Sequence, residues 1–272
     1  MAKNKGMCAI CGKGGKLTFE HVPPKAAGNE TDVKIYGIEE WLGRDVETGE
    51  MPGGHVQPKG TGAISICKRC NEYSGQWYVP EFAKFVRTGR KLFWELKNGI
   101  EDANASLDLK VIDFQISAMR PLPVFKQIIA SLLALNAAEF AQKNPELVKF
   151  VLDREIRGLP EKYRVYCCLF AGPIARFAGL SAEVNVLTQK AVYMTELAYP
   201  PYAYLLTLDS EPLEPLGEIT TWGTRAFDEV RDERLVLTLG FGHTALPGDY
   251  RSEAKVLADT AANMEEAGED GG

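Results

Sequence analysis

Two Cys-x-x-Cys pairs, Cys8–Cys11 and Cys67–Cys70, constrain this chain more than any other feature of its sequence. A gap of two residues lets both thiolates of a tight turn reach one tetrahedral zinc ion. Disulfides are disfavoured in a reducing compartment, so the two pairs together predict one structural Zn²⁺ site. Because four thiolates close the coordination sphere, this ion would supply folding energy and no open position for catalysis.

The chain between the two pairs is longer than the usual spacing of a zinc finger, so it must contain an insertion. Within it, Glu20 and His21 stand side by side and Pro23–Pro24 follow. Residues 16–22 have the composition of a short strand that ends at Pro23. Neighbouring residues of a strand point to opposite faces, so we expect the prolines to bend the strand end and bring both side chains to one site.

The rest of the chain predicts an α+β fold in two parts. A helix is expected over 80–99, with Pro80 in its first turn, and 99–106 has the composition of a linker. Beyond it, a strand at 109–117 precedes a helix at 124–142 that is apolar on nearly all sides and therefore buried. A helix at 144–158 and several strands follow. We therefore expect a small zinc module over 1–98 and a larger α+β domain over 107–272, which ends in an acidic tail.

The two other cysteines, Cys167 and Cys168, lie in an apolar stretch and are predicted to be core residues of a strand. His243 follows a glycine-rich turn and is predicted to be a turn or core histidine.

Charge is distributed unevenly along the chain. Residues 1–97 hold 15 lysines and arginines against 11 acidic residues, a net charge of +4, whereas the remainder holds 16 against 26, a net charge of −10. This asymmetry permits a nucleic-acid-binding first part without requiring one. No apolar run follows the N-terminal lysines, and the most apolar stretch, 128–138, is shorter than the roughly 20 residues of a membrane span. We therefore expect a cytoplasmic protein with no membrane partner.

Three segments, CAIC (8–11), FEHVPPK (19–25) and ISICKRCN (64–71), together resemble the HNH endonuclease superfamily. The likeness is to the zinc-stapled branch, in which a treble-clef knuckle supports a ββα-metal active site, and it covers roughly residues 7–80. It implies a metal-dependent endonuclease that hydrolyses phosphodiester bonds of DNA, with RNA as an open alternative. Modules of this superfamily occur in antiviral defence, restriction and mobile elements, which sets the expected biological context.

The resemblance implies a role for three residues. His21 matches the general base, and an imidazole with a pKa near 6.5 is able to take a proton from water at neutral pH. Glu20 matches a ligand of the catalytic cation, and its hard oxygen suits Mg²⁺ or Mn²⁺. Asn71 matches the third motif position, where its carbonyl oxygen would be a second ligand of that cation.

The middle asparagine of the HNH motif is missing, because that position is Gly62 in this sequence. Two residues remain as alternatives for orienting His21. One is Asn29, and the other is His55, in the loop before the strand predicted at 63–67.

Basic residues near the second cysteine pair are expected to contact the DNA backbone, which positions a nucleic acid without reading its sequence. They are Lys68, Arg69, Lys84, Arg87 and Lys91. Three aromatic residues lie among them, and two alternatives remain for these: stacking on bases, or packing the module onto the second domain. They are Trp77, Tyr78 and Trp94.

A non-catalytic zinc-binding module, which binds nucleic acid or a protein partner, is the competing class of function. Residues 107–272 carry no catalytic constellation, so we expect them to sense, to regulate or to form a homo-oligomer. His21→Ala distinguishes the two classes, since only a nuclease has cleavage to lose.

Overall fold

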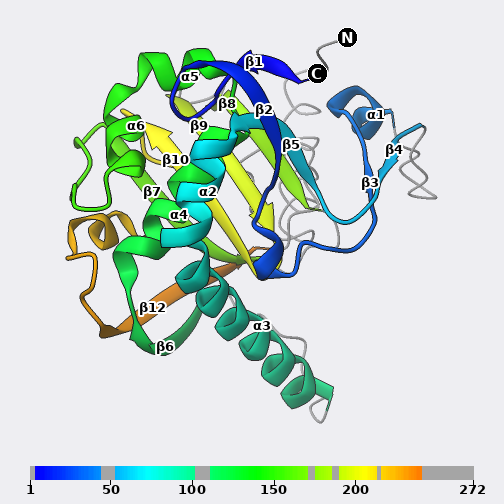
Figure 1. Ribbon diagram of the computed structural model, residues 1–272. Helices are drawn as coiled ribbons and strands as arrows, with labels where there is room; N and C mark the ends of the chain where they lie inside the picture. Colours follow the sequence, from blue (N-terminus) through cyan, green and yellow to red (C-terminus); the bar gives the residue numbers. More distant parts are fainter. Residues whose placement is uncertain are drawn as a thin grey trace, which may run out of the picture.

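A computed structural model describes residues 4–43, 53–101, 111–170, 175–185, 190–212 and 216–240 of the 272-residue chain (Figure 1). The fold is of the α+β class, as the sequence predicts. His243 and the acidic tail lie outside the described residues, as does most of the linker predicted at 99–106. No described helix is both long enough and apolar enough to cross a lipid bilayer.

The N-terminal part is built on a three-stranded antiparallel sheet in the order β1-β2-β5. Its strands are β1 (Lys5–Met7), β2 (Gly14–His21) and β5 (Gly62–Cys67). The pairing of β2 with β5 sets Leu17 opposite Cys67 and His21 opposite Gly62, with a bulge between them. Helix α2 (Lys68–Trp77) follows β5 directly, so the second cysteine pair spans the junction of strand and helix.

The insertion between β2 and β5 forms its own small substructure. It contains a 3-10 turn η1 (Lys25–Ala27), strand β3 (Val33–Ile35), helix α1 (Ile38–Leu42) and strand β4 (His55–Gln57). Strands β3 and β4 pair as a two-stranded antiparallel sheet, which lies to one side of the main body in Figure 1. His55, expected in a loop, is therefore the first residue of a strand.

Helix α3 (Val79–Glu101) begins one residue before Pro80 and extends away from the large sheet in Figure 1. Proline suits this first turn because its missing N–H would have no partner there. The inner face of α3 is buried at Phe82, Phe85 and Val86, as their helical spacing predicts. The helix continues to Glu101, so the linker predicted at 99–106 begins inside it.

The second part contains a seven-stranded sheet in the order β6-β12-β7-β10-β9-β8, with β11 paired to β7. Neighbouring strands are antiparallel except β12 and β7, which run parallel. The strands are β6 (Val111–Met119), β7 (Tyr163–Phe170), β8 (Arg176–Asn185), β9 (Lys190–Tyr199), β10 (Tyr202–Leu208), β11 (Gly217–Glu218) and β12 (Arg231–Gly240). A 3-10 turn, η2 (Thr220–Thr224), connects β11 to the chain that leads to β12.

Helix α4 (Pro121–Ala134) is buried along its whole length, which confirms the prediction of a core helix. It packs between strands β9 and β10 on one side and helices α3 and α6 (Pro145–Leu152) on the other. The predicted helix at 124–142 is in fact two helices, because α4 ends at Ala134 and α5 (Ala138–Lys143) begins afresh. Asn136 stands at the break, and its side-chain amide donates to the Leu132 carbonyl, a local bond that competes with helix continuation.

One lysine of α4 is buried without an acidic partner bonded to it. Lys126 Nζ donates to the backbone carbonyl oxygens of Phe150, Asp153 at 2.9 Å and Ile156 at 2.8 Å. These carbonyls lie at and beyond the C-terminal end of α6, where a positive charge is favourable. Burial lowers the pKa of Lys126 to about 7. The residue therefore joins α4 to the end of α6.

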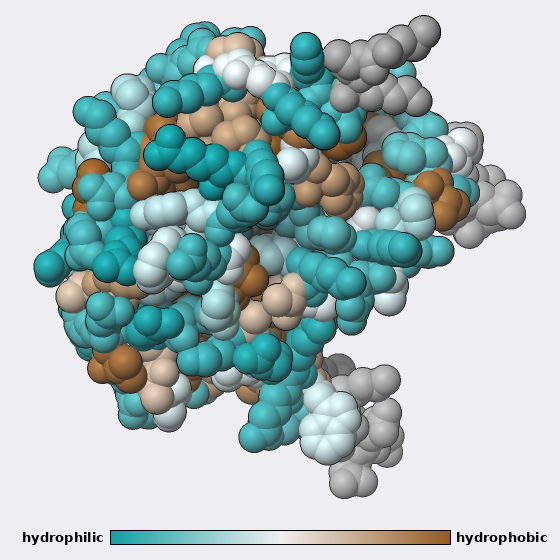
Figure 2. Space-filling model, viewed as in Figure 1, coloured by the Kyte–Doolittle hydropathy of each residue, from teal (hydrophilic) through white to brown (hydrophobic). Residues whose placement is uncertain are grey.

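The two parts share one hydrophobic core. Ile10, in the turn between β1 and β2, and Leu17 of β2 belong to the same buried cluster as Leu133 of α4 and Leu197 of β9. Hydrophilic residues predominate on the face of the molecule in Figure 2, and apolar residues gather there in small groups. The described N-terminal part is therefore held against the large sheet by apolar packing.

Candidate metal centre and adjoining polar site

The four cysteines of the two pairs come together, as the sequence predicts. The Sγ atoms of Cys8, Cys11, Cys67 and Cys70 all lie within 4.8 Å of one another, and Cys11 Sγ is 3.9 Å from Cys67 Sγ. A tetrahedral zinc ion with Zn–S bonds of about 2.3 Å needs its sulfurs about 3.8 Å apart. A disulfide would need about 2.05 Å, and all six cysteines are free thiols. The donor set and its spacing fit a structural metal ion such as zinc.

Cys8 is the cysteine best prepared to be a thiolate. Its Sγ accepts hydrogen bonds from the backbone N–H groups of Cys67 at 3.3 Å and Cys11 at 3.5 Å. The hydrogen bond from the Cys70 thiol, helped by these backbone bonds, lowers the pKa of Cys8 to about 4. A deprotonated sulfur is the form that binds a metal.

Among the described residues, these cysteines are the only group of three or more Cys, His, Asp or Glu side chains close enough to share an ion. Cys167 and Cys168 are buried in β7 at 0% and 1% exposure, which confirms their prediction as core residues.

His21 is the last residue of β2, and its ring is oriented by the main chain. Its Nε2 atom lies 2.9 Å from the carbonyl oxygen of Lys59. A carbonyl only accepts hydrogen bonds, so Nε2 carries the proton and donates it. In the neutral ring the proton-free nitrogen is then Nδ1, which is the atom able to act as a base. Sequence reasoning missed Lys59 because a backbone carbonyl leaves no signal in residue type.

Asn29 holds together the two chain segments that carry His21 and Lys59. Its Nδ2 donates to the carbonyl oxygens of Pro23 and Thr61, each at 2.7 Å, and its Oδ1 accepts from Thr61 N at 2.8 Å. The side chain is fully buried. Gly60 makes the approach possible, because a Cβ there would lie 2.3 Å from the Asn29 carbonyl oxygen and φ is +101°.

His55, the other alternative for orienting His21, lies elsewhere. It is exposed on β4, opposite Ile35 of β3. It has an electrostatic interaction with the carboxylate of Glu40 in α1. Among the described residues no hydrogen bond, ion pair or ring contact joins it to Glu20, His21 or Asn71. Of the two alternatives, Asn29 is the one that supports the His21 segment.

Glu20 is buried, with 9% of its surface exposed, and desolvation raises its pKa to about 7. Alternate residues of a strand share a face, so Glu20 lies on the same side of β2 as Thr18. Asn71 Nδ2 donates to Thr18 Oγ1 and to the Phe19 carbonyl oxygen, each at 3.2 Å. The first turn of α2 therefore brings Asn71 to the face of β2 that carries Glu20.

The chemistry of this arrangement depends on the end of β2. His21 lies on the opposite face of the strand from Glu20 and Asn71, as alternation requires. Because β2 ends at His21, a group placed beyond the strand end can be approached from both faces. Within the described residues the Glu20 carboxylate has no ion-pair or hydrogen-bond partner from another side chain.

The five basic side chains predicted to contact DNA differ in how strongly they are paired with acidic side chains. Lys68 pairs with Glu72 at 3.4 Å and Lys91 pairs with Glu95 at 3.6 Å, both as exposed pairs one helical turn apart. Such surface pairs are worth little, so they would yield readily to a phosphate.

Lys84 is held more firmly than these two lysines. It bonds at 2.6 Å to Glu81, whose side chain is buried and also binds Arg120 at 3.0 Å. Arg69 and Arg87 are exposed and have no ion pair in the part of the chain that the structure describes. These two arginines are the more available of the five.

For two of the three aromatic residues the structure favours packing over base stacking. Trp77 lies edge-on to Phe227 and under the guanidinium of Arg154, whose Cζ is 4.4 Å from the ring centre. Tyr78 is fully buried and donates to the Val151 carbonyl oxygen at 2.6 Å. Trp94, by contrast, is 66% exposed on α3.

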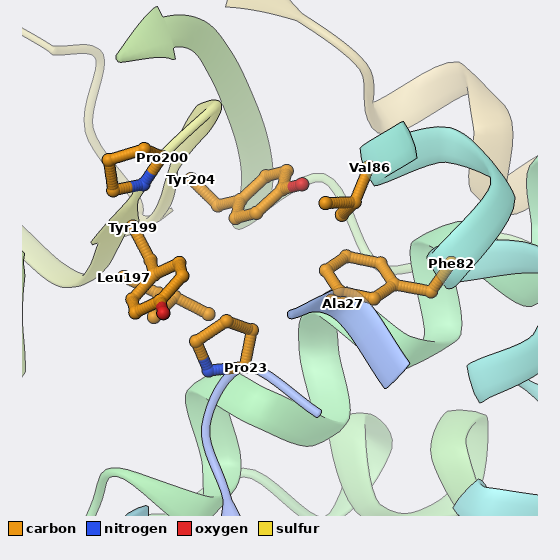
Figure 3. Close-up of a pocket in the computed structure, with 8 residues that line it drawn as sticks. All are labelled: Pro23, Ala27, Phe82, Val86, Leu197, Tyr199, Pro200 and Tyr204. Carbon is orange, nitrogen blue, oxygen red and sulfur yellow. The ribbon is translucent and has the colours of Figure 1, made fainter. Parts of the chain in front are cut away.

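A small hollow of about 10 Å³ lies where the segment after His21 meets α3 and strands β9 and β10 (Figure 3). Pro23, Phe82, Tyr199 and Tyr204 are among its lining residues. The hydroxyl of Tyr204 is buried without a hydrogen-bond partner.

No protein-family model matches the chain, and neither a curated protein nor a solved structure matches it. The likeness to the HNH superfamily thus rests on the motif residues alone, and the endonuclease stays a prediction.

Proposed function

We propose that this protein is a metal-dependent endonuclease of the HNH type, which hydrolyses phosphodiester bonds of DNA. The observation that carries the proposal is the His21–Lys59 contact at the end of β2, beside the buried Glu20 and within a module that the four cysteines hold together. A treble-clef knuckle around a structural zinc ion, followed by a ββα-metal site, is the fold this proposal assigns to residues 1–98.

In this mechanism His21 acts through Nδ1. The Lys59 carbonyl keeps the proton on Nε2 and aims the ring, so that Nδ1 is free to accept a proton from a water molecule. As the proton leaves, the water oxygen forms a bond to phosphorus and the bond from phosphorus to the leaving oxygen breaks, with its electron pair on that oxygen. Asn29 keeps the two loop segments in register during this step.

Glu20 and the Oδ1 atom of Asn71 would hold Mg²⁺ or Mn²⁺. Such an ion, when bound, neutralises charge on the phosphate and on the leaving oxygen. The raised pKa of Glu20 fits this role, since a carboxyl buried without a partner ionises fully once a cation is beside it.

The remaining parts of the proposal concern context. Exposed Arg69 and Arg87 are expected to contact phosphates, RNA is the alternative substrate, and residues 107–272 would control the activity as a regulatory or oligomerising unit. Free cysteines suit the reducing cytoplasm, and a defence, restriction or mobile-element setting follows from the superfamily by analogy only.

A second candidate is a non-catalytic zinc-binding module that binds nucleic acid or a protein. The observation in its favour concerns the described residues. Apart from the four cysteines, they contain no group of three or more Cys, His, Asp or Glu side chains close enough to share a metal ion. Under this alternative the closed four-thiolate site would be purely structural and Glu20 would be a buried acid that holds no cation.

The test is nicking of supercoiled plasmid by the zinc-loaded full chain with Mg²⁺ or Mn²⁺. His21→Ala should reduce the rate to background while zinc content and thermal stability stay as in the wild type. His55→Ala is the matched control, because it removes an exposed histidine that does not contact the site, and it should cleave normally.

Two results would contradict the nuclease. Cleavage retained by His21→Ala would remove His21 as the base. DNA binding by the wild-type chain, with no cleavage under either cation, would favour the binding module.

A further inference from the structure

Two large apolar side chains are exposed next to His21. Phe19 of β2 is 39% exposed and Ile64 of β5 is 46% exposed. They are direct partners in the register of the two strands, so together they form one apolar platform on the sheet surface. Single exposed apolar residues are common, but a cross-strand pair beside a candidate base points to a contact with something else.

The platform and the candidate base are parts of one surface. The rings of Phe19 and His21 meet edge to face with their centres 4.9 Å apart. The residue opposite His21 is Gly62, where a Cβ would lie 2.9 Å from Phe19 Cζ and 2.0 Å from the Glu20 carbonyl oxygen. A Cβ here would clash first with the Glu20 main chain and then with the Phe19 ring, so only glycine fits opposite His21.

We propose that Phe19 and Ile64 bind the face of an unstacked nucleobase, so that the preferred substrate is single-stranded DNA. The inference rests on the nuclease function proposed above and names the form of its substrate. In a nucleotide the base lies one sugar away from the phosphate, so a phosphate beside His21 brings a sugar or base to a group about 5 Å from that ring. In a duplex the faces of the bases are hidden by stacking, and only an unpaired base offers one to an aromatic ring.

Charge supports this occupant over an apolar peptide. The part of the sequence that carries the platform, 1–97, has a net charge of +4, whereas the remainder has −10. A polyanion is drawn to the first part by electrostatics and is then held by stacking, which tolerates any base.

The test is equilibrium binding, measured by fluorescence anisotropy with the zinc-loaded full chain and no added Mg²⁺. The probes are a labelled single strand, the same strand in a duplex, and the same strand with abasic sites in place of bases. We expect the wild type to bind the single strand most tightly. Loss of one base stack should weaken this binding about 5- to 150-fold in Phe19→Ala, with a smaller effect in Ile64→Ala.

The controls separate stacking from other causes. Val56→Ala removes an apolar side chain that is 66% exposed on β4, outside the platform, and should bind as the wild type does. The abasic strand should bind weakly to the wild type and no more weakly to Phe19→Ala, because the lost interaction is the same one. Ile64→Ala is a second test of the platform if Phe19→Ala fails to load zinc. It leaves the contact between the Phe19 and His21 rings in place.

Duplex binding as tight as single-strand binding, or unchanged affinity in both platform variants, would overturn the proposal. Failure of the platform proposal can be distinguished from failure of the nuclease proposal. Binding that depends on Phe19 without cleavage under Mg²⁺ keeps the platform and refutes the nuclease, whereas cleavage that depends on His21 and not on the platform does the reverse.

Discussion

Asn29→Ala is the substitution whose effect the structure defines most sharply. It removes the hydrogen bond to the Pro23 carbonyl, worth about 0.5–1.5 kcal/mol. It also leaves the buried Thr61 N–H without its acceptor, which costs about 1–3 kcal/mol. The Thr61 carbonyl still accepts from Val22 N at 3.1 Å and so loses little. The expected loss in the free energy of unfolding is therefore about 1.5–4.5 kcal/mol, measured by urea denaturation with tryptophan fluorescence.

The same substitution should lower the rate of cleavage at saturating DNA. Without the bridge between Pro23 and Thr61, the Lys59 carbonyl is held less firmly relative to the His21 ring, because only the Lys59 N–H bond to Asp32 and the Val22 N–H bond to the Thr61 carbonyl remain beside it. A displacement of about 1 Å in a catalytic group lowers rates by about 100-fold, so a fall of about 10- to 100-fold in kcat is expected, with a smaller change in KM. Plasmid nicking at several DNA concentrations separates the two parameters.

Asn136 provides a matched control within the chain. It is a buried asparagine whose Nδ2 donates to Leu132 O at 2.7 Å and Thr195 Oγ1 at 2.9 Å, and whose Oδ1 accepts from Leu180 N at 2.6 Å. Asn136→Ala should lose similar stability and keep its kcat per folded molecule. Equal falls in kcat for both variants, or no fall for Asn29→Ala, would refute the positioning role of Asn29.

Two further predictions concern the zinc centre and the buried acid. Cys67→Ser should lower bound zinc, measured by mass spectrometry of the metal, well below one ion per chain, whereas Cys168→Ala, in the core of β7, should retain it. Burial raises the pKa of Glu20 from 4.5 to about 7, so between these values the folded chain holds a proton that the unfolded chain releases. Stability without Mg²⁺ should therefore fall as pH rises from about 5 to about 7, by at most about 1.4 kcal/mol per pH unit. Glu20→Gln should flatten this slope in urea titrations, and an unchanged slope would mean that Glu20 is not the titrating group.

The structure agrees with the sequence where local pattern decides the outcome. The spacing within each cysteine pair can be read directly from the sequence, and it correctly predicts that the four thiols come together. The uniform apolar character near 124–134 likewise predicts a fully buried α4, because such a helix has no face suited to water. The sequence could not predict, by contrast, that Trp94 is exposed and Tyr78 is buried, since both lie among the same basic residues.

The sequence by itself determined the four-thiol cluster, the acid–histidine pair and the α+β class, because these depend on residue types at short spacing. Only the tertiary structure decided how His21 is oriented. Its partner is the main-chain carbonyl of Lys59, and the buried bridge from Asn29 joins segments that are 32 residues apart at Thr61. Carbonyls are common to every residue, and contacts at that separation depend on the path of the folded chain, so no local pattern could have revealed them.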